Sequence, residues 1–270
     1  MKNILSAKLG FIGHKKGTQE NVLKQTENMY DHMVLSLIGS LVASGINIVI
    51  GGRTGTGKST LTNTAIKYIN EDNSIVTLDT EYYSYNLTEL YPERNIVAEE
   101  NNGDHLNTHI GQSKLKEDCS KFSLIAYELS NDEDVAKVLQ LLNVKYNGGC
   151  ILNHHTNNTD DLIYYMIDSL VNAGGFTTSK GAIDTVTDTL DVHIIMDRLP
   201  CGNRYIREIN EIISLDGGKY NVENIISYNR ETKTYTTNKW FSDRLNSRVL
   251  EKLSAEQTKI YNELYDCHWK

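Results

Sequence analysis

Glycine, lysine and serine occur at a fixed spacing between residues 52 and 59, in the segment GRTGTGKS. The segment fits the pattern G-x-x-x-x-G-K-[ST], in which bare backbone amides surround phosphate oxygens. Glycines allow that close approach, and a helix N-terminus adds a partial positive charge at the same point. Lys58 is expected to reach the β- and γ-phosphates, and the Ser59 hydroxyl to hold Mg²⁺. The residues expected to bind the nucleotide are Gly52, Arg53, Thr54, Gly55, Thr56, Gly57, Lys58, Ser59 and Thr60.

The segments on both sides of this loop are those that a phosphate site requires. Residues 46–50 (INIVI) are mostly β-branched, which is typical of a strand covered on both faces, and residues 58–69 have apolar positions at helical spacing. A glycine-threonine turn before a lysine can also arise by chance, but the full pattern and both flanks favour the phosphate loop. The pattern predicts binding of a nucleoside triphosphate. It does not by itself predict hydrolysis, because kinases, GTPases, transporters and motors share it.

Hydrolysis would also need a carboxylate that orients water, at the carboxyl end of a strand beside the loop. Glu128 is the best candidate, since it directly follows the apolar run at residues 122–127. Asp79 and Glu81 follow a second apolar run, at residues 75–78. An acidic residue at a strand end can also be merely solvated or lie near a helix N-terminus.

Two histidines, His154 and His155, follow the segment GGCILN. A histidine at a strand end can sense the γ-phosphate or move a proton. From spacing alone, a structural histidine is the favoured interpretation.

Strand and helix patterns alternate along the chain, which predicts a mostly parallel sheet with helices on its faces. Predicted strands cover residues 74–78, 95–98, 122–127, 150–152 and 193–196, and predicted helices cover 27–43, 132–142 and 160–173. Alternating segments at 204–213, 224–229 and 232–237 indicate antiparallel edge strands, and residues 241–265 a helical end. We therefore expect a polar lead-in (1–26), one α/β domain (27–241) and a C-terminal helical tail (242–270).

Composition narrows the class of protein. A chain of 270 residues can form one large α/β domain, and its net charge of −8 argues against general affinity for nucleic acid. The four cysteines lack C-x-x-C spacing, which is typical of reduced thiols in a cytosolic protein. No stretch has the apolar length of a membrane span, and residues 1–10 lack a signal-peptide core. We expect a cytoplasmic protein.

The order of four segments resembles the order of motifs in the secretion ATPase superfamily. This superfamily comprises the traffic ATPases of type II secretion, type IV pili and type IV conjugative secretion. These segments are residues 46–63, 74–82, 122–158 and 198–212, and the likeness extends from about residue 27 to residue 241. The resemblance implies a RecA-like P-loop NTPase core with ATP and Mg²⁺ as cofactors. It also implies a homo-oligomer such as a hexameric ring, working with membrane-associated secretion or conjugation proteins at the inner face of the cell membrane.

By position in the family motifs, Lys58 and Ser59 resemble the Walker A pair, and Glu128 resembles the Walker B glutamate that polarises the attacking water. His155 matches the histidine box, which changes the favoured interpretation of this residue to a functional one. Residues 79–81 resemble the aspartate box, with Asp79 and Glu81 both open as the equivalent carboxylate.

The sequence departs from the family pattern in several places. Tyr127 replaces the glycine before the Walker B glutamate, and Arg94 is the only arginine between the aspartate box and Glu128. Lysines in that interval cannot reproduce the planar fork of arginine, which predicts weak or partner-dependent hydrolysis. The N-terminal domain of the family is expected to be largely absent, since only the polar lead-in precedes the first predicted helix.

The resemblance leads to one function and two alternatives. The first is an enzyme, a Mg²⁺-dependent ATPase that couples hydrolysis to conformational change in a secretion, conjugation or pilus machine. The second is a weakly hydrolysing, nucleotide-binding assembly or regulatory module of such a system. A plasmid or phage DNA-handling motor is the third, although the acidic balance makes direct nucleic-acid binding unexpected.

Overall fold

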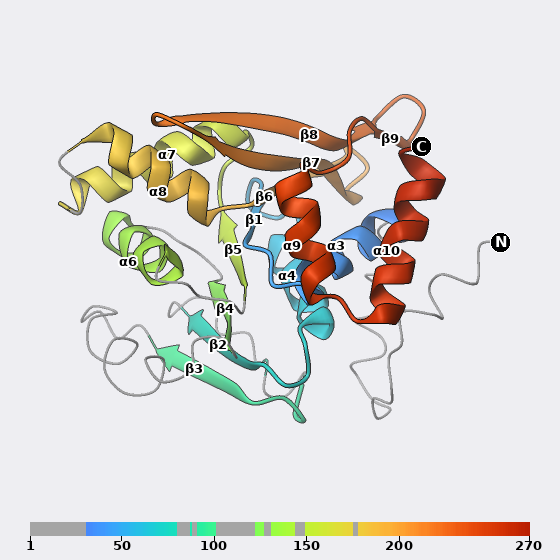
Figure 1. Cartoon of the computed structure of the whole chain (residues 1–270), viewed down its shortest axis with the longest axis horizontal. Coiled ribbons are helices and arrows are strands. Elements are labelled where there is room, and N and C mark those ends of the chain that lie inside the picture. The colour runs from blue at the N-terminus through green and yellow to red at the C-terminus, as the bar shows by residue number, and fades with distance from the viewer. Residues whose placement is uncertain are drawn as a thin grey trace.

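A mixed sheet runs through the centre of the protein (Figure 1). The computed structural model describes residues 31–79, 87, 91–100, 122–126, 131–143, 149–174 and 178–270. Within these residues the sheet has nine strands, in the order β3-β2-β4-β5-β1-β6-β7-β8-β9. The strands are β1 (Ile48–Gly51), β2 (Ser74–Asp79), β3 (Ile96–Glu100), β4 (Phe122–Ala126), β5 (Cys150–His154), β6 (Val192–Arg198), β7 (Arg204–Leu215), β8 (Lys219–Asn229) and β9 (Thr234–Thr237).

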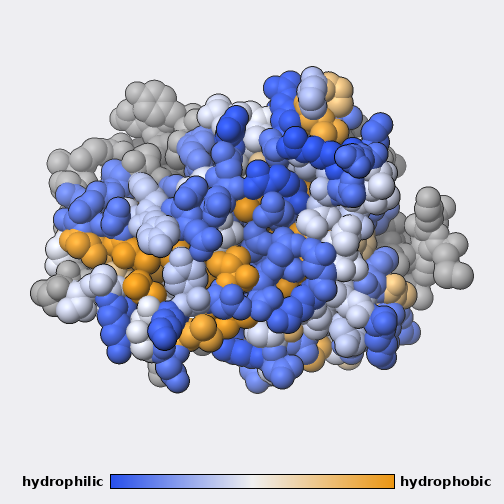
Figure 2. Space-filling model, turned by 90° about the horizontal axis from the view of Figure 1, so that it is seen from above, coloured by the Kyte–Doolittle hydropathy of each residue, from blue (hydrophilic) through white to orange (hydrophobic). Residues whose placement is uncertain are grey.

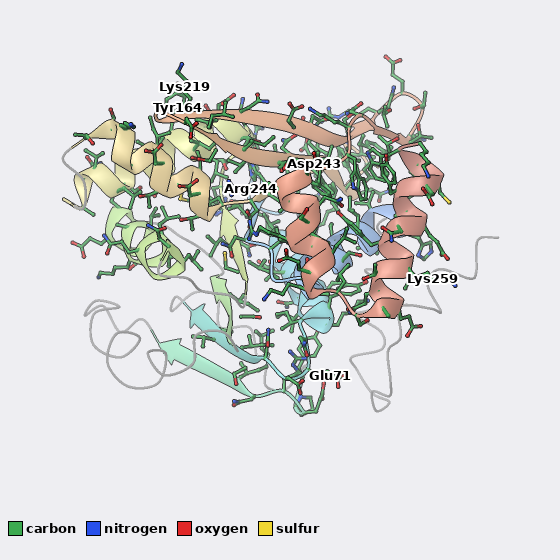
Figure 3. The ribbon with its side chains drawn as sticks, viewed as in Figure 1. Glu71, Tyr164, Lys219, Asp243, Arg244 and Lys259 are labelled. Atoms are coloured by element: carbon green, nitrogen blue, oxygen red, sulfur yellow. The ribbon has the colours of Figure 1, made fainter. Side chains whose placement is uncertain are left out.

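The first six strands in this order are parallel to one another, and β7, β8 and β9 are each antiparallel to the strand before them. The predicted fold class, a RecA-like α/β core with antiparallel edge strands, is confirmed. Strand β8 begins earlier than predicted because Gly217 and Gly218, with φ of 86° and 73°, form a tight turn after β7. Lys219, directly after this turn, points away from the sheet (Figure 3).

Helices cover both faces of the sheet (Figure 1). They are α3 (His32–Ala43), α4 (Lys58–Ala65), the short 3₁₀ helix η1 (Ile66–Tyr68), α6 (Asp132–Asn143), α7 (Thr159–Asn172), α8 (Ser179–Thr189), α9 (Asp243–Lys252) and α10 (Ala255–His268). Helices α3, α4, α9 and α10 share one hydrophobic core with the sheet, and α6, α7 and α8 share the other. Strand β1 contributes Ile48 and Ile50 to the first core and Val49 to the second. Its nearly continuous apolar sequence follows from burial on both faces.

Helix boundaries follow from local capping. Asp31 caps α3 by accepting a hydrogen bond from the Met33 amide, and Gly45 follows the helix with a φ of 70°. Helix α8 was not predicted, because its sequence SKGAIDTVTDT has few apolar residues and several threonines.

The C-terminal segment forms two helices where the sequence predicted one helical stretch. Ser254 separates them, because its side chain and that of Gln257 form a capping box at the start of α10. Arg248 on α9 makes a two-pronged ion pair with the buried Asp191 at the start of β6. The division of the chain after residue 241 stays a prediction, but α9 and α10 contribute side chains to the same core as β1.

Figure 2 shows the protein from above, relative to Figure 1. On this face, hydrophobic residues form small groups separated by hydrophilic residues. Among the described residues, no helix combines the length and the apolar character that crossing a membrane requires.

Candidate nucleotide site

The phosphate loop, residues 52–57, joins β1 to α4. Gly52 has a φ of 143°, and an added Cβ there would lie 2.5 Å from the Met196 carbonyl oxygen. Gly57 has a φ of 98°, and its Cβ would lie 2.8 Å from Cδ of Arg204. Because both the backbone conformation and the neighbouring atoms exclude a side chain, these two positions require glycine.

Helix α4 begins without a side-chain cap. Its N-cap residue is Gly57, which adopts the left-handed conformation and has no side chain to accept hydrogen bonds from the first turn. The helices α3, α7, α8, α9 and α10 are each capped by a side chain, from Asp31, Asn158, Thr178, Ser242 and Ser254. An uncapped helix N-terminus suits an anion, because phosphate oxygens can accept from the first-turn amides. These residues therefore fit a nucleotide phosphate.

Lys58, the first residue of α4, is buried, with a relative exposure of 8%. Its Nζ donates to the carbonyl oxygens of Gly52 at 2.8 Å and Arg53 at 3.2 Å. The same Nζ lies 3.3 Å from Nδ1 of His155. Because an ammonium group only donates, Nδ1 of His155 is the acceptor, and a neutral His155 then carries its proton on Nε2. The structure thus brings together two residues that lie far apart in the sequence.

His155 begins the histidine loop, residues 155–158, between β5 and α7. Strand β5 lies directly beside β1, with His154 paired to Gly51, so the two loops leave the same edge of the sheet. Thr62 on α4 also donates to the Asn153 side-chain oxygen at 2.9 Å, which joins the helix after the phosphate loop to β5. These contacts explain the proximity of His155 to Lys58, while its catalytic role stays a prediction.

The strands that contain or precede the predicted carboxylates lie on the other side of β5 from the phosphate loop. Strand β4, which ends at Ala126, is next to β5, and β2, which ends at Asp79, lies beyond β4. With neighbouring strands about 4.8 Å apart, β4 is about 10 Å from β1 and β2 is about 14 Å away. A carboxylate after β4 is therefore better placed than Asp79 to reach water beside a phosphate on this loop. Glu128 and Glu81 lie outside the described residues.

Several solved structures resemble this chain, including the three that follow. The VirB11 ATPase of the Brucella suis type IV secretion system is 17% identical with a TM-score of 0.53, and the match covers 72% of this chain and 56% of VirB11. The chain shares its fold with this ATPase. DotB of Legionella pneumophila matches with 15% identity and a TM-score of 0.41, over 90% of this chain and 57% of DotB. The pilus retraction motor PilT, with bound ADP, matches with 17% identity and a TM-score of 0.40, over 84% of this chain and 56% of PilT.

The fold assignment rests on VirB11, and it confirms at the level of the fold the resemblance predicted from the order of motifs. No protein-family model matches the sequence, and no curated protein sequence matches it. The chain spans little more than half the length of the three proteins that it matches.

The arginines near the site are Arg204 and Arg207, whereas the arginine considered from the sequence is Arg94. Arg94 donates to the carbonyl oxygens of Ile69 at 3.0 Å and Asn70 at 2.8 Å, beside the amino end of β2, at the opposite edge from the phosphate loop. Arg204, the first residue of β7, instead donates from Nε to the Gly55 carbonyl oxygen at 3.1 Å. Arg207 donates to the Asn157 carbonyl oxygen in the histidine loop. Both arginines lie in the fourth family-like segment, residues 198–212, but their spacing alone did not single them out.

Two further histidines lie beneath the site. His193 on β6 is fully buried, with Nδ1 3.0 Å from the Thr159 hydroxyl and Nε2 against Gly51. His154 packs against Tyr165 in a tilted arrangement, with ring centroids 4.5 Å apart. Burial lowers the pKa of His193 to about 3 and that of His154 to about 4, with a smaller effect of neighbouring positive charge. Both rings are therefore neutral near pH 7.

These lowered pKa values predict acid sensitivity. The histidine pKa in the unfolded chain is about 6.5, so the unfolded chain binds more protons than the folded chain between about pH 6.5 and pH 4. The stabilisation from keeping these histidines neutral is complete above about pH 6.5. Below that pH, the free energy of unfolding falls by about 1.4 kcal/mol per pH unit for each histidine. Urea unfolding at pH 7, 6 and 5 measures this loss. Between pH 7 and pH 5, the free energy of unfolding of His193→Gln should fall by about half as much as that of the wild type. A free energy of unfolding that does not change with pH in the wild type would contradict buried, neutral histidines.

Proposed function

We propose that this protein is a Mg²⁺-dependent ATPase that couples hydrolysis to conformational change in a secretion, conjugation or pilus-assembly machine. One observation carries the proposal. The buried Lys58 ammonium group contacts phosphate-loop carbonyls and His155, at the uncapped N-terminus of α4. The secretion-ATPase fold supports the choice of machine.

Residues 52–60 would bind the phosphates of ATP through backbone amides, and the Ser59 hydroxyl would ligate Mg²⁺. Mg²⁺ supplies neutralisation of the charge on the β- and γ-phosphates. Lys58 would exchange its contacts with the Gly52 and Arg53 carbonyls for phosphate oxygens, because a charge-assisted contact with an anion is stronger than one with a neutral carbonyl. The burial of Lys58 strengthens that attraction, since water screens it less.

Hydrolysis would need two more groups from this chain. Glu128, after β4, would orient the attacking water and accept its proton. His155 would respond to the movement of Lys58, since their nitrogen atoms are 3.3 Å apart before nucleotide binds. Asp79 or Glu81, after β2, would act at longer range, through water or on the metal. The order of strands β2, β4 and β5 in the sheet and the family resemblance support these roles.

Assembly is part of the proposal. VirB11 belongs to a type IV secretion system, and PilT is a pilus retraction motor. By analogy, this chain would form a homo-oligomeric ring, such as a hexamer, and would act with membrane-associated machinery from the cytoplasmic side. Binding of ATP would favour one arrangement of subunits, and hydrolysis would release it.

A second candidate is a nucleotide-binding assembly or regulatory module with little hydrolysis. Arg94 favours it, because its guanidinium group contacts Ile69 and Asn70 at the far edge of the sheet and does not approach the phosphate loop. A DNA-handling motor has less support, since the chain carries a net charge of −8.

Two measurements on the same sample separate these functions. We expect the purified chain to release phosphate from ATP in the presence of Mg²⁺, and its particle mass in light scattering to rise when MgATP is added. A rise in mass without phosphate release would instead indicate the regulatory module. A salt-sensitive affinity for DNA would indicate the DNA motor.

A further inference from the structure

Two arginines on β7 each donate a hydrogen bond to a backbone carbonyl of a different loop of the nucleotide site. Nε of Arg204 donates to Gly55 in the phosphate loop at 3.1 Å, and Nη2 of Arg207 donates to Asn157 in the histidine loop. We propose that β7 sets the spacing between these two loops, with Arg204 and Arg207 as positioning residues. The proposal rests on the proposed function for its kinetic consequences, but not for its structural ones.

Arg204 acts on the shape of the phosphate loop. Loop amides bind phosphate only when they point inward, so the carbonyl of each such peptide must point elsewhere. The guanidinium group of Arg204 holds the Gly55 carbonyl, and its aliphatic stem fills the space beside Gly57 that a Cβ would need. Arg204 thereby restricts the rotation of the peptide planes in the loop before any nucleotide arrives.

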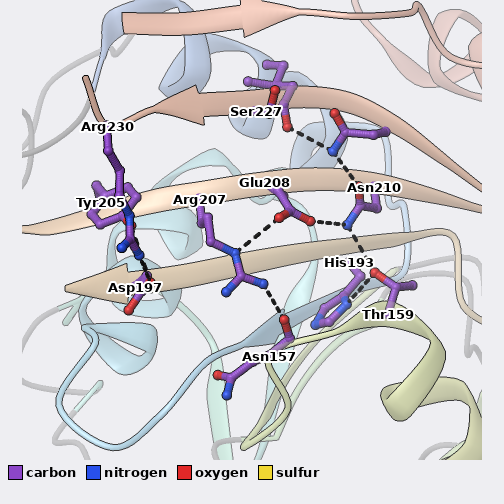
Figure 4. A network of polar contacts seen from close by, with 12 residues as sticks. Asn157, Thr159, His193, Asp197, Tyr205, Arg207, Glu208, Asn210, Ser227 and Arg230 are labelled. Carbon is purple, nitrogen blue, oxygen red and sulfur yellow. Dashed lines mark hydrogen bonds and ion pairs between the residues drawn. The ribbon is translucent and has the colours of Figure 1, made fainter. Parts of the chain in front are cut away.

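Arg207 acts on the histidine loop, and a β-bulge sets its direction. Along β6 and β7, Ile195 pairs with Glu208 and Met196 pairs with Ile206, so Arg207 is the extra residue. A bulge of this kind re-aims a side chain. The Glu208 carboxylate accepts from Nε of Arg207 at 3.1 Å, which leaves Nη2 to bond Asn157, two residues after His155 (Figure 4).

The far end of the histidine loop is also attached to β7. The Asn210 side-chain amide donates to the Thr159 hydroxyl at 3.0 Å, and Thr159 is the first residue of α7 (Figure 4). On the other side, Asn224 of β8 donates to the Asn210 side-chain oxygen at 2.7 Å. Strand β7 is thus fixed between β6 and β8 while its polar side chains hold the loop.

The consequence is a rigid link between two groups that must act together. Lys58 follows the loop that Arg204 holds, and His155 begins the loop that Arg207 holds. Because both arginines come from one strand, three residues apart, the 3.3 Å separation of Lys58 Nζ and His155 Nδ1 is set from β7. Loss of either arginine should loosen one loop and leave the other in place.

Three single variants of the full chain test this assignment: Arg204→Ala, Arg207→Ala and the control Arg198→Ala. Arg198 pairs with Arg204 through the β6–β7 ladder, but its side chain is exposed and donates from Nε to the Gly202 carbonyl of its own turn at 3.0 Å, so Arg198→Ala leaves the ladder in place. Hydrogen exchange without nucleotide is the first measurement. We expect Arg207→Ala to speed amide exchange in residues 153–159 alone, Arg204→Ala to speed it in residues 52–60 alone, and Arg198→Ala to change neither segment.

Kinetics in MgATP provide the second measurement. We expect Arg204→Ala to weaken nucleotide affinity about tenfold and Arg207→Ala to lower kcat about tenfold with little change in affinity, because small displacements of reacting groups have effects of this order. Arg207→Lys should recover part of kcat, since one ammonium donor can still reach the Asn157 carbonyl.

Failure of the proposed ATPase function and failure of the proposed role of β7 give different results. Wild-type protein that neither binds nor hydrolyses ATP would refute the proposed function, and the exchange pattern would then decide the role of β7 alone. Exchange that rises equally in both loops for either arginine variant, or no more than in Arg198→Ala, would overturn the assignment of β7.

Discussion

Replacing Lys58 by alanine is expected to weaken the binding of MgATP by about a hundredfold or more and to abolish turnover. The ammonium group is buried and held by two carbonyls of the phosphate loop, so its loss would remove charge-assisted hydrogen bonds to the phosphates worth about 3 kcal/mol. Titration of a fluorescent nucleotide into the variant measures the affinity, and phosphate release measures the turnover.

A matched control separates this effect from a general loss of charge. Lys219 is exposed at the start of β8 and points into solvent, so Lys219→Ala should bind and hydrolyse ATP as the wild type does (Figure 3). Lys58→Arg should fail nearly as badly as Lys58→Ala, because a planar guanidinium group cannot occupy the place of a compact ammonium group between two carbonyls. Affinity for MgATP that survives in Lys58→Ala would contradict the assignment of this residue.

Replacing Glu128 by glutamine should have the second large effect, a fall in turnover of about a hundredfold or more with nucleotide binding retained. Loss of a general base commonly lowers the rate by about two to four orders of magnitude. A glutamine has almost the same shape but cannot accept the proton of the attacking water, so the phosphate loop remains intact. Phosphate release and nucleotide titration on the same sample measure the two quantities separately.

The control for this variant is Glu231→Gln, a change of an exposed carboxylate in the turn between β8 and β9. It should alter neither quantity. Unchanged turnover in Glu128→Gln would remove Glu128 from its role and direct attention to Asp79 and Glu81. Asp79→Asn is expected to reduce turnover less than Glu128→Gln, because β2 is one strand further than β4 from the phosphate loop.

Most of the sheet could be predicted from the sequence because its central strands are buried on both faces. Strand β1 gives Ile48 and Val49 to opposite cores, and this double burial produces the apolar run that marks a parallel strand. The phosphate loop was predictable for a different reason. Gly52 and Gly57 adopt backbone conformations that other residues rarely adopt. Their spacing from Lys58 is fixed by the loop that they form.

Contacts between distant segments could not be predicted from local patterns. Arg204 and Arg207 reach the site because β7 returns antiparallel to β6, and the bulge at Arg207 breaks the alternation on which a sequence-based prediction depends. Helix α8 and the break between α9 and α10 depend on weak periodicity and on the capping by Ser254. The proximity of His155 to Lys58 follows from the pairing of β1 with β5, which the order of elements alone does not specify.

The most direct test of the account is the affinity of the intact chain for MgATP, measured by calorimetry with and without Mg²⁺. We predict saturable binding that weakens when Mg²⁺ is removed, because in the proposed function the phosphate loop and Lys58 bind a metal-bound triphosphate. Wild-type protein that binds no magnesium nucleotide at saturating concentration would contradict the central claim and leave only the fold.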